Sequence, residues 1–310
     1  MRNRLFIIGN GFDLAHELPT SYPDHFKKIA ESNESITYFW DIYQTETPNI
    51  WSDFEYCLGH PDFNSLEEIF EGYAPDYLSD HESDRDAIIT QVDISGNLYK
   101  SLSQFAENAE TDLHKKMPLE KYSNCFCDND VFVSFNYTHT LERLYGIKET
   151  NVLHIHGEVG KSNLIMGYPK GEYKPEKYIY DVRQKGRGPY RECDIRDHVK
   201  QMEAEEIFDY YTAKAYKDLI DKTESFNKDY QEHAFASFLN HRIINEIIIL
   251  GHSCKIDFDY FQYLTRTFPG AKWVFNPHAE DDLNNITELI KRIGLREHNY
   301  MINPVEESLS

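Results

Sequence analysis

Residues 5–13 of the chain are LFIIGNGFD, and this stretch decides the fold. The apolar run predicts a short buried strand, and the two glycines predict a tight turn at its end. The next residues, 14–17, are LAHE and predict the first turns of a helix. A strand that passes through a glycine turn into a helix is how α/β folds present backbone amides to a nucleotide phosphate. The turn lacks the third glycine of the full dinucleotide-binding pattern, so a plain structural role is equally open at this stage.

The composition limits the classes of partner. The 310 residues suffice for one large α/β domain or two smaller ones, and a hydrophobic fraction of 40% suffices for a core. The net charge of -21, from 53 acidic and 32 basic residues, argues against binding of duplex nucleic acid, which needs clustered Lys and Arg. No stretch approaches the ~18–20 continuous apolar residues of a membrane span. We therefore expect neither a membrane nor duplex nucleic acid as a partner.

The cysteines form an odd, scattered set of five without a C-x-x-C pair. They are Cys57, Cys125, Cys127, Cys193 and Cys254. This usage predicts neither a zinc module nor a disulfide framework, and it is typical of reduced thiols in the cytoplasm. We expect a cytoplasmic protein without a bound metal.

Further apolar runs predict the rest of a mostly parallel sheet. They cover residues 131–135, 152–155, 246–250 and 272–275, with weaker runs at 163–167 and 299–302. Two long, mainly helical segments interrupt them, at about 22–120 and 169–243. Helical patterns within these segments cover residues 51–58, 87–113, 204–217 and 234–244, and a Gly- and Arg-rich loop covers 185–189. The sequence therefore predicts one α/β domain over residues 1–310, with a Rossmann-like sheet and two large helical insertions.

Polar residues follow the second and third predicted strands. Asn136 ends the run at 131–135, and Thr138 is placed to cap a helix that runs to Gly146. An amide there either binds a ligand or hydrogen-bonds its own turn. His154 and His156 are expected on one face of their strand, and as metal ligands they lack a third partner at a suitable spacing. His156 lies at the strand end before a glycine and is suited to proton transfer at neutral pH. For His154 we favour a structural role.

The run at 246–250 ends in Gly251, His252 and Ser253. Small and polar residues at that position are suited to binding a ribose or a phosphate. A nucleophilic Ser253 is disfavoured, because the G-x-S-x-G pattern of hydrolases requires glycine at position 255, which is Lys255 here.

Five segments together resemble the AbiH family of bacterial phage abortive-infection proteins, and they occur in the order of that family. The segments are FIIGNGFDL at 6–14 with LPTSY at 18–22, WSDFE at 51–55, SFNYT at 134–138, HIHG at 154–157 and GHS at 251–253. The likeness spans most of the chain apart from the helical insertions. This family in turn looks like a distant branch of the sirtuin-like fold, which binds NAD in a Rossmann-type sheet.

The resemblance implies a set of functional residues. It implies Asn136 and His156 as the catalytic pair. The residues implied in nucleotide binding are Gly9, Asn10, Gly11, Phe12, Asp13, His154, Gly251, His252 and Ser253. The chain lacks the four-cysteine zinc module of the deacylase branch, so deacylation is not expected. Its first turn also differs from the Gly-Ala-Gly type of sirtuins, so a nucleotide other than NAD stays open.

The leading hypothesis is an NAD glycohydrolase that depletes NAD during phage infection. Asn136 holds water or a ribose hydroxyl in this hypothesis, His156 acts as the base, and Glu55 and Asp13 are further orienting groups. Because a free NADase kills its own host, we expect gating by a phage component, a partner protein or oligomerisation. A nucleotide sensor or scaffold without turnover is the first alternative. A metal-dependent nuclease that uses His154, His156 and a carboxylate is the second.

Overall fold

The computed structural model describes residues 3–32, 51–62, 65, 95–169, 177–180, 191–194, 200, 210–277 and 280–303. The chain divides into two compact units. Unit 1 comprises Met1–Phe26, Ser101–Met166 and Asp229–Ser310, and unit 2 comprises Lys27–Lys100 and Gly167–Lys228. Unit 2 is thus drawn from the two segments that the sequence marks as insertions.

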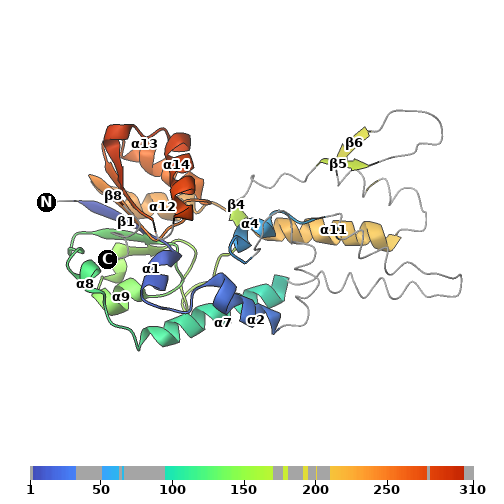
Figure 1. Cartoon of the computed structure of the whole chain (residues 1–310), viewed down its shortest axis with the longest axis horizontal. Helices are drawn as coiled ribbons and strands as arrows, with labels where there is room; N and C mark the ends of the chain where they lie inside the picture. Colours follow the sequence, from blue (N-terminus) through green and yellow to red (C-terminus); the bar gives the residue numbers. More distant parts are fainter. Residues whose placement is uncertain are drawn as a thin grey trace, which may run out of the picture. The chain divides into compact units, whose positions relative to one another are not determined.

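Unit 1 is built on a six-stranded parallel sheet with the strand order β10-β9-β8-β1-β2-β3 (Figure 1). The strands are β1 (Arg4–Ile8), β2 (Val131–Ser134), β3 (Val152–His154), β8 (Glu246–Leu250), β9 (Lys272–Asn276) and β10 (Tyr300–Ile302). With the strands counted along the chain, this is the order 3-2-1-4-5-6 of the doubly wound Rossmann sheet. The predicted Rossmann-like parallel sheet is therefore confirmed. The order reverses between β1 and β8, where such sheets bind ligands.

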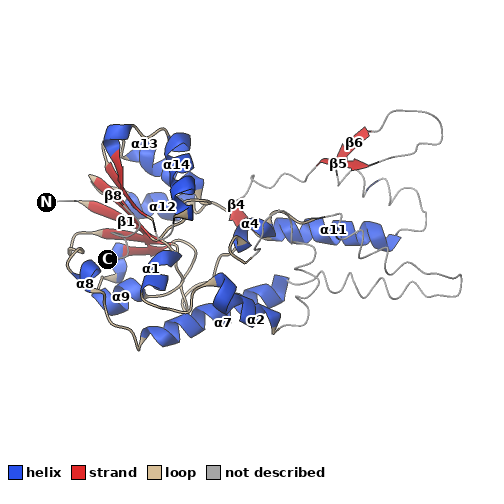
Figure 2. Cartoon of the chain, viewed as in Figure 1, coloured by secondary structure: helices blue, strands red, loops and turns tan. Residues whose placement is uncertain are grey.

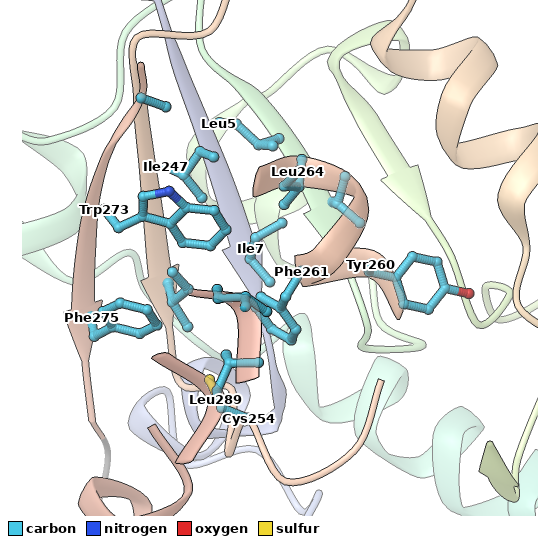
Figure 3. Packing of buried hydrophobic residues seen from close by; sticks show 14 of the residues in the cluster. Leu5, Ile7, Ile247, Cys254, Tyr260, Phe261, Leu264, Trp273, Phe275 and Leu289 are labelled. Atoms are coloured by element: carbon cyan, nitrogen blue, oxygen red, sulfur yellow. The ribbon is translucent and has the colours of Figure 1, made fainter. Parts of the chain in front are cut away.

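Helices cover both faces of this sheet, as a parallel sheet requires (Figure 2). Leu5 and Ile7 point to one face and pack with residues of α12 (Glu232–Leu239), α13 (Phe258–Thr267) and α14 (Asp281–Ile293). Figure 3 shows this core, in which Trp273 and Phe275 of β9 lie opposite Phe261 and Leu264 of α13. Phe6 and Ile8 point to the other face and pack with residues of α1 (Asn10–Ala15), α8 (Glu120–Ser123) and α9 (Thr140–Tyr145).

One predicted strand is wrong. Residues 163–166 form an irregular segment, in which the amide of Ile165 donates to the carbonyl of His156 at 2.8 Å. Tyr137 Oη donates to the carbonyl of Ile165 at 2.8 Å. The segment is therefore held by single hydrogen bonds to a turn and to a side chain, and not by the regular backbone hydrogen bonds of a strand. The first helix also starts earlier than predicted, at Asn10 rather than Leu14. Gly9, in extended conformation, is the N-cap residue of this helix.

Unit 2 combines helices with two small sheets. Its helices include α2 (Lys27–Glu31), α4 (Phe54–Leu58) and α11 (Tyr210–Ser225), and α7 (Ser95–Leu113) begins in this unit and continues into unit 1. β4 (Tyr168–Pro169) pairs with β7 (Asn227–Lys228) in parallel, and β5 (Lys177–Tyr180) pairs with β6 (Arg191–Asp194) in antiparallel. Residues 87–94 of the predicted long helix and the loop at 185–189 lie outside the described residues. No helix in the described part of the chain is long and apolar enough to cross a membrane.

Candidate functional site

The turns that follow β1 and β8 touch each other backbone to backbone. The amide of Gly9 donates to the carbonyl of Leu250 at 3.0 Å, and the amide of Gly11 donates to that of Gly251 at 2.8 Å. A Cβ at Gly9 would lie 2.5 Å from the Cα of His252. At Gly251, where φ is +65°, it would lie 2.3 Å from the backbone nitrogen of Phe12. Both positions therefore require glycine, because a side chain would push the two turns apart.

Amide groups that we predicted to bind a phosphate already donate hydrogen bonds within the protein. Besides the bond from Gly11, the amide of Phe12 donates to the carbonyl of Gly9 at 2.9 Å. The Asn10 side chain donates to the carbonyl of Thr20 at 2.7 Å. In this structure these three donors bind groups of the protein, so a role in nucleotide binding stays a prediction that requires the turn to rearrange.

Asp13 joins this turn to the connection between β2 and α9. Its buried carboxylate accepts hydrogen bonds from Thr138 Oγ1 at 2.5 Å and from Thr140 Oγ1 at 2.8 Å. Burial raises the pKa of Asp13 to about 6, although hydrogen bonds from both threonines and from Asn136 oppose this rise. The expected cap by Thr138 is wrong, because its hydroxyl binds Asp13 and the residue before α9 is His139. Gly146 does end this helix in the left-handed conformation, as predicted.

Asn136 connects the turns that follow β1, β2 and β3. Its Nδ2 donates to the carbonyl of Gly9 at 3.0 Å. Its own carbonyl lies 3.1 Å from Nδ1 of His154. The structure thus brings these predicted site residues together at the carboxyl edge of the sheet, where Asn136 is 7% exposed.

His154 belongs to a histidine–carboxylate cluster that comprises Glu110, His139, Glu142, His154 and Glu158. Nε2 of His154 lies 2.9 Å from Oε1 of Glu142. Nδ1 and Nε2 of His139 lie 3.0 and 2.9 Å from carboxylate oxygens of Glu110 and Glu158. Every imidazole nitrogen in this cluster therefore has a hydrogen-bond partner.

The carboxylates of this cluster favour the charged imidazoles. The pKa of His139 is raised, chiefly by its hydrogen bond to Glu110. Burial alone lowers the pKa of His154, but the hydrogen bond and charge of Glu142 outweigh it, and the net pKa is raised. The pKa of Glu110 is lowered, because its bonds to His139 outweigh its burial. Arg143 adds a further positive charge, with Nε 2.8 Å from Glu110 Oε1.

His156 lies in a second group, the His156–Asp257 cluster, which comprises Phe135, His156, His252 and Asp257. Nε2 of His156 is buried and has no hydrogen-bond partner among the described residues. The nearest carboxylate oxygen is Oδ1 of Asp257, at 3.6 Å, and Oδ2 of Asp257 lies 3.9 Å from Nε2 of His252. The ring of Phe135 meets both imidazoles edge to face, with centroids 5.0 and 4.6 Å away.

The prediction that His154 and His156 share one face is wrong. β3 ends at His154, and Ile155 and His156 form a turn that redirects the second side chain. His154 therefore contacts α9, whereas His156 lies against Phe135, which packs in the core beneath α12, α13 and α14. Among the described residues, no three or more His, Cys, Asp or Glu side chains are grouped to hold a metal ion.

The remaining predicted residues are placed as follows. His252 is buried, and its Nδ1 accepts the amide of Cys254 at 3.0 Å, so the neutral ring carries its proton on Nε2. Ser253 is exposed. Glu55 lies in unit 2, where its carboxylate binds Nζ of the buried Lys228 at 2.8 Å. Glu55 is therefore part of a buried ion pair of that unit.

Sequence reasoning missed Asp257. This residue precedes α13 and has φ of +68°, which is uncommon for a residue with a side chain. An aspartate just before an apolar helical run is a known helix-start signal, yet its carboxylate makes no cap hydrogen bond and is 4% exposed beside two imidazoles. Glu110 and His139 were also missed, because their pairing across 29 residues leaves no local pattern.

Comparison with known protein families identifies a match. The family model described as "Bacteriophage abortive infection AbiH" matches residues 5–277. No curated protein matches the chain. The matched range spans the turns after β1, β2, β3 and β8, which meet at the carboxyl edge of the sheet. The chain belongs to the AbiH family of bacteriophage abortive infection.

Proposed function

We propose that this protein acts in abortive infection by hydrolysing NAD to nicotinamide and ADP-ribose. The observation that carries the proposal is the state of the His156 imidazole. Its Nε2 atom is buried and has no hydrogen-bond partner among the described residues, and it lies at the carboxyl edge of a Rossmann-type sheet. A buried polar atom of this kind needs an explanation, and a catalytic role is one such explanation.

The reaction needs few groups. The bond between the nicotinamide nitrogen and the ribose carbon breaks, and nicotinamide leaves with the bonding electrons. Water adds to the same carbon and loses a proton, which His156 Nε2 accepts as general base. Such a proton transfer contributes about 10²–10⁴-fold to a rate. Asn136 positions the ribose or the water through its amide, since it already lies between the turns of β1 and β3.

Asp257 supports the role of His156. Its carboxylate stands 3.6 Å from Nε2, and a small movement of either side chain brings the charge close to the ring. A carboxylate beside an imidazole stabilises the imidazolium that forms when the base accepts a proton. Asp257 is therefore a positioning residue for His156 in this proposal.

The burial of His156 fits an enzyme that rests in an inactive form. His156 is 4% exposed and Asn136 is 7% exposed, so substrate reaches them only after a rearrangement. An enzyme that depletes NAD must be inactive in an uninfected host, because constant activity is lethal. We propose that a phage component or a partner protein triggers the rearrangement.

The test is nicotinamide release from NAD by the full chain, with and without lysate of phage-infected cells. We expect release only with the infected lysate. Asn136→Ala and His156→Ala should abolish it, and Asp257→Asn should lower kcat more than it raises KM. His298→Ala, at an exposed histidine of the same unit, is the matched control and should retain full activity. Full release by both Asn136→Ala and His156→Ala contradicts the proposal.

A nucleotide sensor without turnover is the second candidate. The observation that favours it is the engagement of the first-turn amides with the protein's own carbonyls, which a bound nucleotide would exchange for phosphate contacts. Such a sensor predicts that NAD raises the thermal unfolding midpoint while no nicotinamide appears, even with infected lysate.

A further inference from the structure

Two cysteines lie at the opposite edge of the sheet from the candidate site. Cys125 and Cys127 follow α8 and precede β2, so they lie near the amino ends of the strands. Cys127 is exposed, and Cys125 is half-buried. The other two described cysteines, Cys57 and Cys254, are buried. Oxidants and small thiols in solution therefore reach the first pair before the other two.

The sulfurs of both cysteines lie near the buried guanidinium of Arg4. Nη2 of Arg4 lies 3.3 Å from Sγ of Cys127, and Nη1 lies 4.0 Å from Sγ of Cys125. The same Nη2 donates to the carbonyl of Cys125 at 2.6 Å. Arg4 is in turn held by Asp130, whose carboxylate it contacts at 2.5 and 3.0 Å. The ion pair of Arg4 and Asp130 therefore fixes the side from which both cysteines are contacted.

The spacing of the pair permits a disulfide. Residues i and i+2 have Cα atoms at most about 7 Å apart, because the extended chain spans no more than about 3.6 Å per residue. Disulfides take Cα separations of about 4.4–6.8 Å. The Cα separation of this pair is therefore compatible with a disulfide.

A hollow beside Cys127 offers room for a second molecule. Its volume is about 220 Å³, and its lining includes Phe126, Cys127, Tyr145, Lys148 and Asn151. The exposed thiol thus borders a concave surface of the size of a small organic group. Neither this hollow nor the pair contributes to the His156–Asp257 cluster.

We propose that Cys125 and Cys127 form a redox-sensitive dithiol that exchanges with a low-molecular-weight disulfide bound at this hollow. Cys127 loses its proton to water and attacks one sulfur of the disulfide, which releases one small thiolate. Cys125 then loses its proton and attacks Sγ of Cys127, which releases the second thiolate. Both released thiolates take up protons from water. The two cysteines are oxidised to one disulfide, and the external disulfide is reduced to two thiols.

The order of attack follows from the two environments. Burial raises the pKa of Cys125, even though Arg4 opposes the rise, so little of this thiol is in its reactive thiolate form at neutral pH. Cys127 is the exposed thiol and has the shorter distance to Arg4. Cys127 is therefore the attacking residue, and Cys125 resolves the mixed disulfide.

The test treats the full chain with oxidised glutathione and follows its mass and its disulfide-linked peptides. Cys193, which lies outside the described residues, is replaced by serine in every sample. We expect the parent protein to lose two hydrogen masses through a link between Cys125 and Cys127, reversibly with dithiothreitol. Cys125→Ser should stop at one glutathionyl group on Cys127, and Cys127→Ser should not react.

Cys57→Ser is the matched control and should react like the parent. Reaction of Cys127→Ser at the parental rate, glutathionylation confined to Cys57 or Cys254, or a pair that stays reduced overturns the proposal. The readout is independent of NAD, so its failure leaves the proposed NADase activity standing, and the reverse also holds.

Discussion

The two histidine clusters at the carboxyl edge of the sheet differ in how fully their imidazole nitrogens are bonded. In the histidine–carboxylate cluster, His139 and His154 lie 2.9–3.1 Å from their partners. In the His156–Asp257 cluster, the Nε2 atoms of His156 and His252 lie 3.6 and 3.9 Å from oxygens of one carboxylate. A satisfied buried network rigidifies a fold, whereas an unsatisfied group costs free energy and persists where a function requires it. The comparison assigns a structural role to His154 and supports the catalytic role that we propose for His156, only two residues along the chain.

The largest expected effect is on activity, at His156. His156→Ala should lower nicotinamide release by about 10²–10⁴-fold, the usual contribution of a general base. The free energy of unfolding should change less than in the His154 variant below, because Nε2 of His156 gives up no hydrogen bond. Release assays and urea unfolding of the same samples measure both quantities. A variant that unfolds at much lower urea but keeps its activity per folded molecule reverses the assignment.

The next effect is on stability, at the histidine–carboxylate cluster. His154→Ala removes bonds to Glu142 and to the carbonyl of Asn136 and leaves the Glu142 side chain, 12% exposed, without its partner. Hydrogen bonds to charged groups contribute about 1.5–3 kcal/mol each, and we expect a loss of that order in the free energy of unfolding. His298→Ala is the exposed control and should cost much less. Equal losses in the two variants contradict a structural role for His154.

The same cluster predicts a pH dependence of stability. The pKa values of His139 and His154 are raised in the folded protein. Their stabilisation is complete below the unfolded pKa of about 6.5 and is lost as the pH rises through the higher folded values. The free energy of unfolding should therefore fall above about pH 6.5, by at most about 1.4 kcal/mol per pH unit for each histidine. Urea unfolding across this range measures the slope.

Replacement of both histidines by glutamine tests the origin of this slope. The double variant should be less stable near neutral pH, with a flatter dependence above it. An unchanged slope assigns the effect to groups outside the cluster. Asp13 and Glu110 contribute little to the slope above pH 6.5. The pKa of Asp13 is about 6 and that of Glu110 is lowered, so both carboxyl groups are largely ionised in this range.

The sheet was predictable because its strands are buried apolar runs that end in glycine or polar residues. Residues 5–9 and 246–250 needed only hydropathy and the glycines to be predicted as strands that end in turns at the carboxyl edge. That the two strands are neighbours in the sheet was not predicted. The side-chain clusters were not predictable in the same way. The face of His156 depends on where β3 ends, and a single residue of extension would change it. The positions of Glu110 and Asp257 depend on how helices pack on the sheet, for which local sequence carries no signal.

The smallest expected effect concerns Asp13, which links the first turn to Asn136. Thr140→Val keeps the shape of the side chain but removes the hydroxyl that donates to Asp13 Oδ1 at 2.8 Å. Thr138 still donates to the other oxygen, so below about pH 6, where Asp13 is largely protonated, we expect a loss of about 0.5–1.5 kcal/mol in the free energy of unfolding. The pKa of Asp13 should rise above its value of about 6, because the lost bond favoured the charged form. The extra loss should therefore grow as the pH rises from about 6, where the wild-type carboxylate ionises.

Thr265→Val is the matched control, because its hydroxyl binds only the carbonyl of Phe261 one helical turn earlier, at 2.9 Å. That carbonyl keeps its place in the helix ladder, so the control should cost little and show no dependence on pH. A pH-dependent loss confined to Thr140→Val identifies Asp13 as a buried charge that the threonines stabilise. Equal, pH-independent losses indicate instead that Asp13 is already protonated at neutral pH. Its bonds to the threonines then contribute no more than a neutral hydrogen bond, and the turn after β1 is held mainly by the backbone contact between Gly9 and Gly251.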